Sequence, residues 1–271
     1  MSIFKLQQFS VKQTLAGMKI CSDSLLFGAL IPINKSTKRI LDIGTGTGIL
    51  ALMQAQKSKA LTESSLEKIT AVELTQAAAV EAQENFSNSP WSEYLDIVIQ
   101  AIQQFSKHFK QSAMSHQTVG YDLIMCNPPF FVNQTKTSVD NPLRHAARHS
   151  DSLSFTDLCQ SIDKLLTDSG RAHLLLPVIA ITEFCVAASA AGLGLVERMD
   201  IAESPDHPVK VAALTFARDN MLAVHKRASD SDSALTLMIE YKHGRLNKFK
   251  QANVHSDDVR DLLSPFLLRY L

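Results

Sequence analysis

The chain has no surplus of one charge, since its 271 residues carry 27 lysines and arginines against 27 aspartates and glutamates. This balance excludes a uniformly basic protein that coats nucleic acid or an anionic membrane, although it leaves room for a local basic patch. No stretch approaches the ~20 apolar residues of a membrane span, and the first residues, MSIFKLQQFS, lack the apolar core of a signal peptide. We therefore expect a soluble, cytoplasmic protein.

Cysteine is scarce, and its spacing is uninformative for metal binding. The 4 cysteines include no C-x-x-C pair, and the 9 histidines show no ligand spacing. These patterns exclude a disulfide framework and a zinc knuckle, so we expect no metal. Hydrophobic residues make up 45% of the chain and charged residues 20%, which is too apolar for a disordered protein and sufficient for a sizeable core.

Short apolar segments alternate with helical patterns from residue 39 onward. This alternation is typical of the α/β class, with a mostly parallel sheet and helices on both faces. Strands are expected at Arg39–Ile43, Ile69–Glu73, Asp96–Gln100, Tyr121–Cys126, Arg171–Leu176, Leu193–Ile201 and Val209–Phe216. Helices are expected at 47–56, 77–86 and 154–166, the last capped by Ser154 or Thr156 and ended by Gly170.

Three regions fall outside this alternation. Residues 1–38 contain a helix near 21–31 that Ser22 or Asp23 caps, and residues 130–152 form a long polar stretch of a kind that is usually functional or mobile. Residues 218–271 contain a β-like run at 234–241, a basic stretch and an amphipathic helix at 256–271. We expect one domain at 39–217, with the two terminal regions as additions that pack on it.

Glycine is sparse, with only 10 residues, yet Gly44, Gly46 and Gly48 lie between the first strand and the first helix. Glycine there allows a tight turn and a close approach of the backbone to a ligand, although a simple tight turn is the alternative. The pattern D-x-G-x-G-x-G, which begins at Asp42, differs from the G-x-G-x-x-G of dinucleotide sites. No Walker lysine follows, which disfavours nucleoside triphosphate chemistry.

The second strand ends at Glu73, where a carboxylate can accept both hydroxyl protons of a ribose. A strand, a glycine loop, a helix and an acid that closes the next strand predict a nucleoside-cofactor pocket at the carboxyl edge of the sheet. A solvated strand end is the alternative for Glu73.

The fourth strand runs directly into Asn127, Pro128, Pro129 and Phe130. The prolines fix φ and carry no N–H, and Asn127 is extended because it precedes a proline, so the turn is stiff and presents acceptors. The Asn127 side-chain oxygen and a proline carbonyl can accept both N–H groups of one planar amine. Two acceptors that favour pyramidal geometry release the delocalised lone pair towards an electrophile.

Phe130 supplies a flat surface on which a planar substrate can stack. The alternative is that this turn only ends the strand. Cys126 is interpreted as a packed side chain, since no basic partner is evident that would make it a nucleophile.

The segments LDIGTGTG, AVEL and NPPF resemble class I S-adenosylmethionine-dependent methyltransferases that act on exocyclic or amide nitrogen. Over nearly the whole chain, the sequence resembles the bacterial tRNA1(Val) (adenine(37)-N6)-methyltransferase family through MKICSDSLLFGAL, QENFSNSPW, AIQQF, DLIMCNPPFF and RHAARHSDSLSFTDL. The resemblance implies a Rossmann-like fold with a seven-stranded, mostly parallel sheet and a reversed final hairpin. It also implies S-adenosylmethionine as the methyl donor and adenine 37 of one valine tRNA as the acceptor.

The resemblance also implies roles for individual residues. Asn127, Pro128 and Phe130 would be catalytic and hold the target amine, and Glu73 would hold the cofactor ribose. An N-terminal K-x-x-x-D pattern would cover the site. The implied cofactor-binding residues are Lys19, Asp23, Asp42, Gly44, Gly46, Gly48, Glu73, Ala101, Ile102 and Asn127.

One position departs from the family pattern. Related sequences tend to carry an acid after the third strand, where this chain has Ala101 followed by Ile102 and Gln103. The cofactor adenine would then be bound by backbone groups, by apolar packing or by Gln103.

An RNA substrate requires contacts to phosphates and a base that is splayed from its stack. The stretch YKHGRLNKFKQ contains no acid and includes two aromatic residues, and a second basic group follows the Asn127 turn. The candidate substrate-binding residues are Pro129, Phe131, Arg144, Arg148, Lys242, Arg245, Lys248 and Lys250. A solvated surface is the alternative for the basic residues.

Two other functions stay open on the residues alone. The first is an N-methyltransferase of DNA adenine or of a protein glutamine amide, because the turn recognises an NH2 group and not the molecule attached to it. The second is a non-enzymatic RNA- or partner-binding protein on the same fold. The intact Asn127 and glycine loop favour an enzyme.

Overall fold

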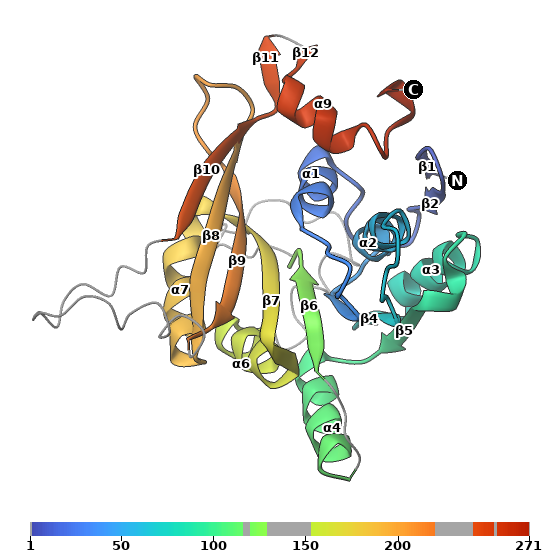
Figure 1. Ribbon diagram of the computed structural model, residues 1–271, viewed down its shortest axis with the longest axis vertical. Helices are drawn as coiled ribbons and strands as arrows, with labels where there is room; N and C mark the ends of the chain where they lie inside the picture. The colour runs from blue at the N-terminus through green and yellow to red at the C-terminus, as the bar shows by residue number, and fades with distance from the viewer. Residues whose placement is uncertain (1, 116–119, 129–152, 220–240, 252–253, 271) are drawn as a thin grey trace, which may run out of the picture.

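A mostly parallel sheet of eight strands forms the centre of the molecule (Figure 1). The computed structural model describes residues 2–115, 120–128, 153–219, 241–251 and 254–270, and all structural statements refer to these. In spatial order the strands are β10 (Lys242–Asn247), β8 (Leu193–Ala202), β9 (Val211–Arg218), β7 (Leu166–Pro177), β6 (Tyr121–Cys126), β3 (Arg39–Ile43), β4 (Lys68–Glu73) and β5 (Leu95–Ile99). Only β9 runs against its neighbours β7 and β8.

The α/β class and the reversed strand near the end of the sheet are therefore confirmed, and one strand more than the expected seven is present. The extra strand, β10, comes from the basic stretch and pairs with β8 at the edge of the sheet. Its sequence, KHGRLN, has no apolar alternation because an edge strand buries little: only Leu246 in it is fully buried.

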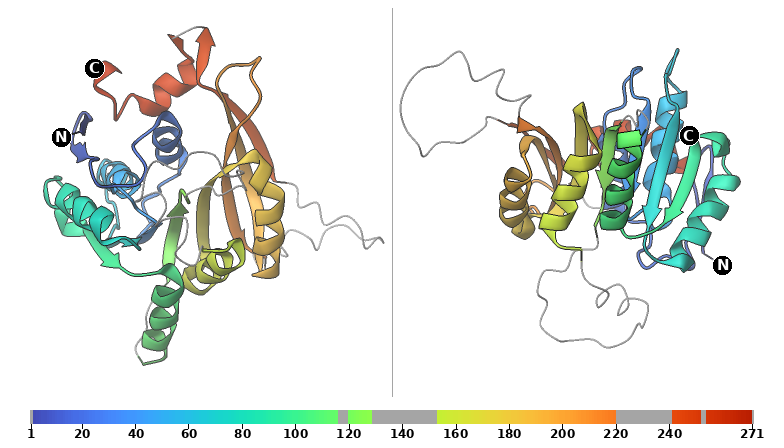
Figure 2. Two further views of the ribbon diagram at one scale, coloured as in Figure 1. Left: turned by 180° about the vertical axis from the view of Figure 1, so that it is seen from behind. Right: turned by 90° about the horizontal axis from the view of Figure 1, so that it is seen from below.

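Helices cover both faces of the sheet (Figure 2). One face packs on α1 (Ser22–Leu30), α2 (Ile49–Lys59) and α3 (Gln76–Ser87), and the other on α4 (Ile102–Ser115), α6 (Phe155–Leu165) and α7 (Ile181–Ala190). Short 3-10 helices lie at η1 (Ser92–Tyr94), η2 (Val178–Ala180) and η4 (Leu268–Tyr270). None of the described helices is long and apolar enough to cross a membrane.

Both ends of the described chain pack into the core on the α1 side. The N-terminal end forms a hairpin of β1 (Ile3–Lys5) and β2 (Ser10–Lys12), and the C-terminal end forms β11 (Phe249–Gln251), β12 (Val254–His255) and α9 (Asp257–Leu263). Gln7 joins the two, since its Nε2 donates to the carbonyls of Ser264 at 2.7 Å and Leu267 at 2.9 Å. The three-part division of the chain stays a prediction.

Several predicted helix ends are wrong. The residue that caps α1 is Cys21, not Ser22 or Asp23. Ser154 caps α6 as expected, with its Oγ accepting from the Asp157 N–H at 3.0 Å, but α6 ends at Leu165 because β7 begins at the next residue. Gly170 thus lies inside a strand.

The C-terminal helix is shorter than predicted. Helix α9 ends at Leu263, because Pro265 cannot donate in the helix ladder and its ring clashes with the preceding turn. The β-like run at 234–241 lies outside the described residues except for Tyr241, which is not in a strand.

Candidate active site

The predicted site residues meet at the carboxyl edge of the sheet. Ile43 at the end of β3 is paired with Val72 of β4 on one side and with Cys126 of β6 on the other. The residues that follow these three, Gly44, Glu73 and Asn127, therefore lie side by side. In an open α/β sheet, ligands bind outside this edge.

The three glycines of the loop have different roles. Gly44, Gly46 and Gly48 have φ values of +69°, +55° and +82°, in the left-handed region that favours glycine. A Cβ at Gly44 or Gly46 would meet no atom of the described residues within 4 Å, whereas a Cβ at Gly48 would lie 2.5 Å from the Phe86 ring. Gly44 and Gly46 thus border open space that a ligand can enter, and Gly48 allows α3 to pack against the loop.

The Glu73 carboxylate holds the glycine loop in place. Its Oε2 accepts from the Gly46 N–H at 3.0 Å, and its Oε1 accepts from the N–H and hydroxyl of Thr75, both at 2.9 Å. A carboxylate has about four acceptor positions, so capacity for a further donor is left. A ribose hydroxyl fits that capacity.

Asp42 lies fully buried beneath the loop. Burial raises its pKa to about 7, hydrogen bonds from Thr45 and the Ala51 backbone oppose the rise, and the charge of Glu73 adds to it. Oδ2 accepts from the Thr45 hydroxyl at 2.6 Å, while Oδ1 has no hydrogen-bond partner among the described residues. A buried acid with a vacant acceptor suits a cationic ligand such as a sulfonium cofactor.

The stability of the protein is expected to reflect this titration. Between pH 4 and 7 folded Asp42 binds its proton more tightly than the unfolded chain does, so its contribution to the free energy of unfolding falls as pH rises. The slope is about 1.4 kcal/mol per pH unit. The Asp42→Asn variant lacks this loss, so its stability relative to wild type should rise by about 2 kcal/mol between pH 5 and 7.

Urea denaturation of both proteins at pH 5, 6, 7 and 8 measures the difference. The comparison of the two proteins is needed because buried His173 changes the free energy of unfolding in the opposite direction as pH rises. Burial and the charges of Lys57 and Arg171 lower its pKa to about 3. A difference between the two proteins that stays constant over this range would contradict the raised pKa of Asp42.

Asn127 presents a buried acceptor without a donor. It follows β6 directly, and its Oδ1 is buried and has no hydrogen-bond partner among the described residues. Leaving such an atom unsatisfied costs about 1–3 kcal/mol, so a ligand donor is the expected partner. Pro128 beside it is buried. Five predicted site residues lie outside the described residues: Pro129, Phe130, Phe131, Arg144 and Arg148.

Cys126 is not a nucleophile. Burial, with the charges of Asp42 and Cys159 adding to it, raises the pKa of its thiol well above the ordinary value. The thiol is 1% exposed and stays protonated near neutral pH, in agreement with a packing role.

The predicted adenine-binding positions differ in exposure. Ile102 is buried in the core at 5% exposure, and the Ala101 carbonyl accepts from the N–H groups of Gln104 and Phe105 at the start of α4. Sequence reasoning missed two exposed apolar residues next to Glu73. Leu74 directly follows Glu73 and is 54% exposed, and Ile99 ends β5, pairs with Glu73 and is 45% exposed. The sequence signal for both is an apolar residue at or just after the carboxyl end of a strand. Their exposure at that place is seen only in the structure.

Lys248 does not face solvent, contrary to its predicted role in phosphate binding. Its Nζ lies 2.7 Å from Asp23 Oδ1 and 2.7 Å from Glu203 Oε1, and its side chain is 9% exposed. Burial alone would lower its pKa, but the two carboxylates outweigh burial and raise it. Lys248 thus fixes α1 to the end of β10, and its ammonium group is not available to an RNA phosphate. Lys19 is exposed.

The other basic residues of the stretch are exposed but have internal partners. Lys242 lies 3.2 Å from Glu197, Lys250 lies 3.1 Å from Asp257, and Arg245 donates to loop carbonyls between β8 and β9. Lys242 begins β10 and Lys250 follows its end. Lys242 therefore lies at the edge formed by the amino ends of the parallel strands, and Lys250 at the carboxyl edge. The stretch is therefore not one basic patch.

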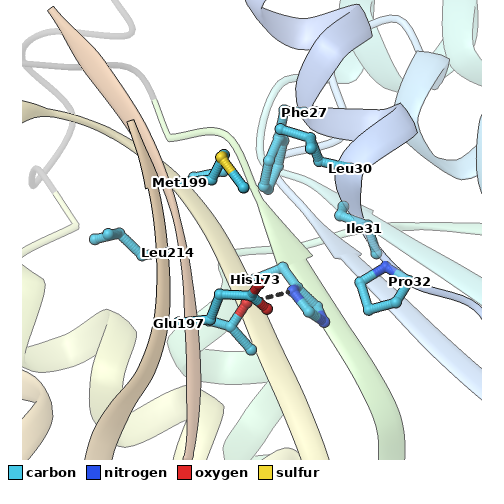
Figure 3. Close-up of a pocket in the computed structure, with 10 residues that line it drawn as sticks. Phe27, Leu30, Ile31, Pro32, His173, Glu197, Met199 and Leu214 are labelled. Atoms are coloured by element: carbon cyan, nitrogen blue, oxygen red, sulfur yellow. Dashed lines mark hydrogen bonds between the residues drawn. The ribbon is translucent and has the colours of Figure 1, made fainter. Parts of the chain in front are cut away.

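A cavity of about 40 Å³ lies away from the carboxyl edge of the sheet, under the C-terminal end of α1 (Figure 3). His173 and Thr215 line it, with His173 Nδ1 and Thr215 Oγ1 3.1 Å apart. One water needs about 10–15 Å³ of cavity volume, so the cavity holds a few waters at most and is too small for a nucleoside. No group of three or more potential metal ligands occurs among the described residues.

The fold and the carboxyl-edge site together define a class I S-adenosylmethionine-dependent methyltransferase. A solved structure of a predicted O-methyltransferase from Agrobacterium tumefaciens has the same fold, with a TM-score of 0.58 at 15% identity over 90% of this chain and 96% of that one. The family model "Methyltransferase small domain" matches residues 21–152.

Curated relatives are closer in sequence. A tRNA1(Val) (adenine(37)-N6)-methyltransferase from Cytophaga hutchinsonii is 43% identical over 194 residues, 72% of this chain and 74% of the relative. One of the same name from Shewanella frigidimarina is 32% identical over 98% of this chain and 99% of its own. The chain belongs to the tRNA1(Val) (adenine(37)-N6)-methyltransferase family.

Proposed function

We propose that the protein transfers a methyl group from S-adenosylmethionine to N6 of adenine 37 in the anticodon loop of tRNA1(Val), as a step of tRNA modification in the cytoplasm. Family membership supports the substrate. The observation that carries the chemistry is the buried Oδ1 of Asn127 beside Gly44, which has no hydrogen-bond partner in the described part of the chain. An acceptor at this place fits an N–H donor, which adenine N6 supplies.

The residues present fit the cofactor. Gly44 and Gly46 leave room for its methionine part, Glu73 has acceptor capacity for ribose, and Asp42 offers a buried carboxylate. Leu74 and Ile99 offer apolar surface for adenine. When bound, the cofactor supplies an electrophilic methyl group on a sulfonium sulfur.

The protein's own contribution is positioning and electrostatics. Asn127 Oδ1 and the Pro128 carbonyl accept the two N–H groups of adenine N6, which draws the nitrogen lone pair out of the ring system and aims it at the methyl carbon. Phe130 stacks on the base. Because the bound cofactor would supply a methyl group already activated by the sulfonium charge, the amine would only have to lose one proton to water, and no strong side-chain base is required.

The test is incubation of the protein with labelled S-adenosylmethionine and, in separate reactions, bulk tRNA, genomic DNA and protein extract. Label is expected in tRNA, and a tRNA1(Val) transcript with guanine at position 37 is the matched control that should stay unlabelled. Label that enters only DNA or protein would replace the proposal by one of its two rivals. No transfer to any of the three would favour a binding protein.

Lys250 is expected to contact tRNA phosphate, because it is 47% exposed at the same sheet edge as Asn127. Four strand spacings separate β10 from β6, about 19 Å, which an RNA stem-loop can span. Lys250→Glu should weaken tRNA binding severalfold and lower the salt dependence by about one counterion, as measured by filter binding at several salt concentrations.

Lys242→Glu is the matched control for that variant. It reverses the same charge on the same chain segment and removes a similar ion pair, but at the opposite edge of the sheet. Equal losses of affinity in the two variants would show a nonspecific charge effect and contradict the placement of tRNA over Lys250.

A further inference from the structure

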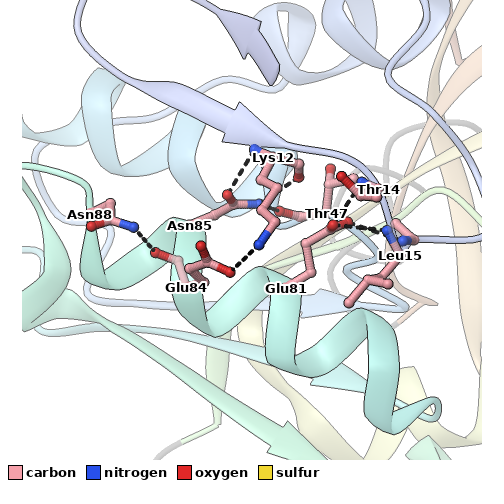
Figure 4. Close-up of polar contacts among 9 residues, drawn as sticks. Lys12, Thr14, Leu15, Thr47, Glu81, Glu84, Asn85 and Asn88 are labelled. Carbon is pink, nitrogen blue, oxygen red and sulfur yellow. Dashed lines mark hydrogen bonds and ion pairs between the residues drawn. The ribbon is translucent and has the colours of Figure 1, made fainter. Parts of the chain in front are cut away.

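A buried carboxylate on α3 binds three successive backbone N–H groups of the N-terminal segment (Figure 4). Glu81, 0% exposed, accepts from Thr14 at 2.6 Å and Leu15 at 2.8 Å through Oε2, and from Ala16 at 3.0 Å through Oε1. Charge-assisted hydrogen bonds of this number compensate the burial of the charge. Residues 14–16 are thereby fixed to α3.

Asn85, one turn further along α3, joins the same segment to the glycine loop. Its Oδ1 accepts from the Lys12 N–H at 2.8 Å, and its Nδ2 donates to the Lys12 carbonyl at 2.9 Å and to the Thr47 carbonyl at 2.8 Å. Helix α3 therefore holds the N-terminal segment and the glycine loop in one fixed arrangement.

The chain on either side of residues 17–21 is fixed by contacts with α2 and α3. Gln54 Nε2 donates to the Gly28 carbonyl at 2.8 Å, and Lys57 Nζ donates to the Ala29 carbonyl at 2.8 Å. The C-terminal ends of α1 and α2 thus lie together, and Gly28 also packs on Leu50 and Met53. From Lys12 beside Asn85 to residues 14–16 beside Glu81, the N-terminal segment runs towards the start of α3, which follows Glu73 at the carboxyl edge.

Residues 17–21 therefore connect the segment held on α3 to Ser22 at the start of α1. The span is short and closed, because Gln13 Oε1 accepts from the Ile20 N–H at 2.9 Å. Within it Met18 is 50% exposed and Lys19 is exposed. These side chains are available to a ligand at the glycine loop.

We propose that Glu81 and Asn85 are positioning residues for cofactor binding: they hold residues 12–16 so that residues 17–21 form a wall over the glycine loop. The inference rests on the proposed cofactor site. Without the Glu81 carboxylate, the three N–H groups lose their acceptor, and the wall is ordered in only a fraction of molecules. The apparent cofactor affinity falls by that fraction.

The first test measures binding of S-adenosylhomocysteine by calorimetry, without RNA. Glu81→Ala should weaken binding at least about tenfold, and Glu81→Gln should fall between it and wild type, since an amide keeps one acceptor oxygen. Glu84→Ala is the matched control: it removes a charge from the same helix, but Glu84 is half-exposed and bonds only the Lys12 ammonium through its side chain. It should bind within about twofold of wild type.

A merely structural role is distinguished by kinetics and by proteolysis. In Glu81→Ala, KM for S-adenosylmethionine should rise while kcat at saturating cofactor stays within about threefold, because the wall acts on binding. Trypsin should cleave after Lys19 faster than in wild type. A folded Glu81→Ala protein that binds S-adenosylhomocysteine within twofold of wild type would overturn the proposal.

Hydrogen exchange of the wild-type protein tests the wall without any substitution. Addition of S-adenosylhomocysteine should slow exchange in residues 14–21, and unchanged exchange there would overturn the proposal even if Glu81→Ala failed to fold. The binding and exchange experiments do not depend on which molecule receives the methyl group. Label in DNA instead of tRNA would therefore refute the proposed function and leave this inference intact.

Discussion

Replacing Asn127 with alanine is expected to abolish methyl transfer while the affinity for S-adenosylhomocysteine stays within about twofold of wild type. Alanine removes the buried Oδ1 that has no donor among the described residues. Loss of one preorganised hydrogen-bonding group that stabilises a transition state costs about 10²–10³ in kcat. Here the effect should reach the upper end, because the same group also aligns the amine with the methyl carbon.

Transfer to tRNA1(Val) in single-turnover assays and calorimetry with S-adenosylhomocysteine give the two quantities separately. Asn88→Ala is the matched control, because Asn88 is exposed just after the end of α3 and, among the described residues, its Nδ2 bonds only the Glu84 carbonyl. Turnover of Asn127→Ala within tenfold of wild type would rule out the acceptor role. Equal loss of turnover and of cofactor affinity would instead indicate that the whole edge is distorted.

The central site could be predicted because each of its residues directly follows a strand with a clear apolar pattern. Glu73 ends its strand, Gly44 and Asn127 directly follow theirs, and parallel strands place their carboxyl ends at one edge. The glycine spacing and the two prolines then restrict the backbone at those positions. Local pattern and topology thus suffice for this part of the molecule.

The surface around the site could not be predicted in the same way, because its contacts join residues far apart in the sequence. The stretch at 241–251 contains no acid, yet Lys248 is buried between Asp23 of α1 and Glu203, which follows β8. Likewise, Glu81 and Asn85 are ordinary polar residues of a helix until the N-terminal segment packs on them. A charge count along the chain cannot reveal such pairing.

Glu73→Gln is expected to reduce the affinity for S-adenosylmethionine about 100-fold. The carboxylate accepts from Gly46 on one oxygen and from Thr75 on the other. An amide must place its NH2 against one of these donors, so either the glycine loop or the start of α3 shifts. The ribose also loses a charged acceptor, and hydrogen bonds to charged groups contribute about 1.5–3 kcal/mol each, where 1.4 kcal/mol is tenfold in affinity.

Calorimetry with S-adenosylhomocysteine measures the loss, and Glu67→Gln is the matched control. Glu67 precedes the same strand, but it is 57% exposed and its side chain lies 3.4 Å from the Lys38 ammonium. Its removal should leave cofactor affinity within about twofold of wild type. Affinity of Glu73→Gln within fivefold of wild type would contradict the assignment of Glu73 to the ribose.

A second readout of Glu73→Gln separates a local effect from unfolding. The Glu73 charge contributes to the raised pKa of Asp42, so its loss should lower that pKa. The fall of the unfolding free energy with rising pH should then begin at the same pH but end below pH 7, because the folded carboxyl group ionises earlier. A folded variant with weak cofactor binding and this narrower pH range would show that Glu73 acts on both the loop and the acid beneath it.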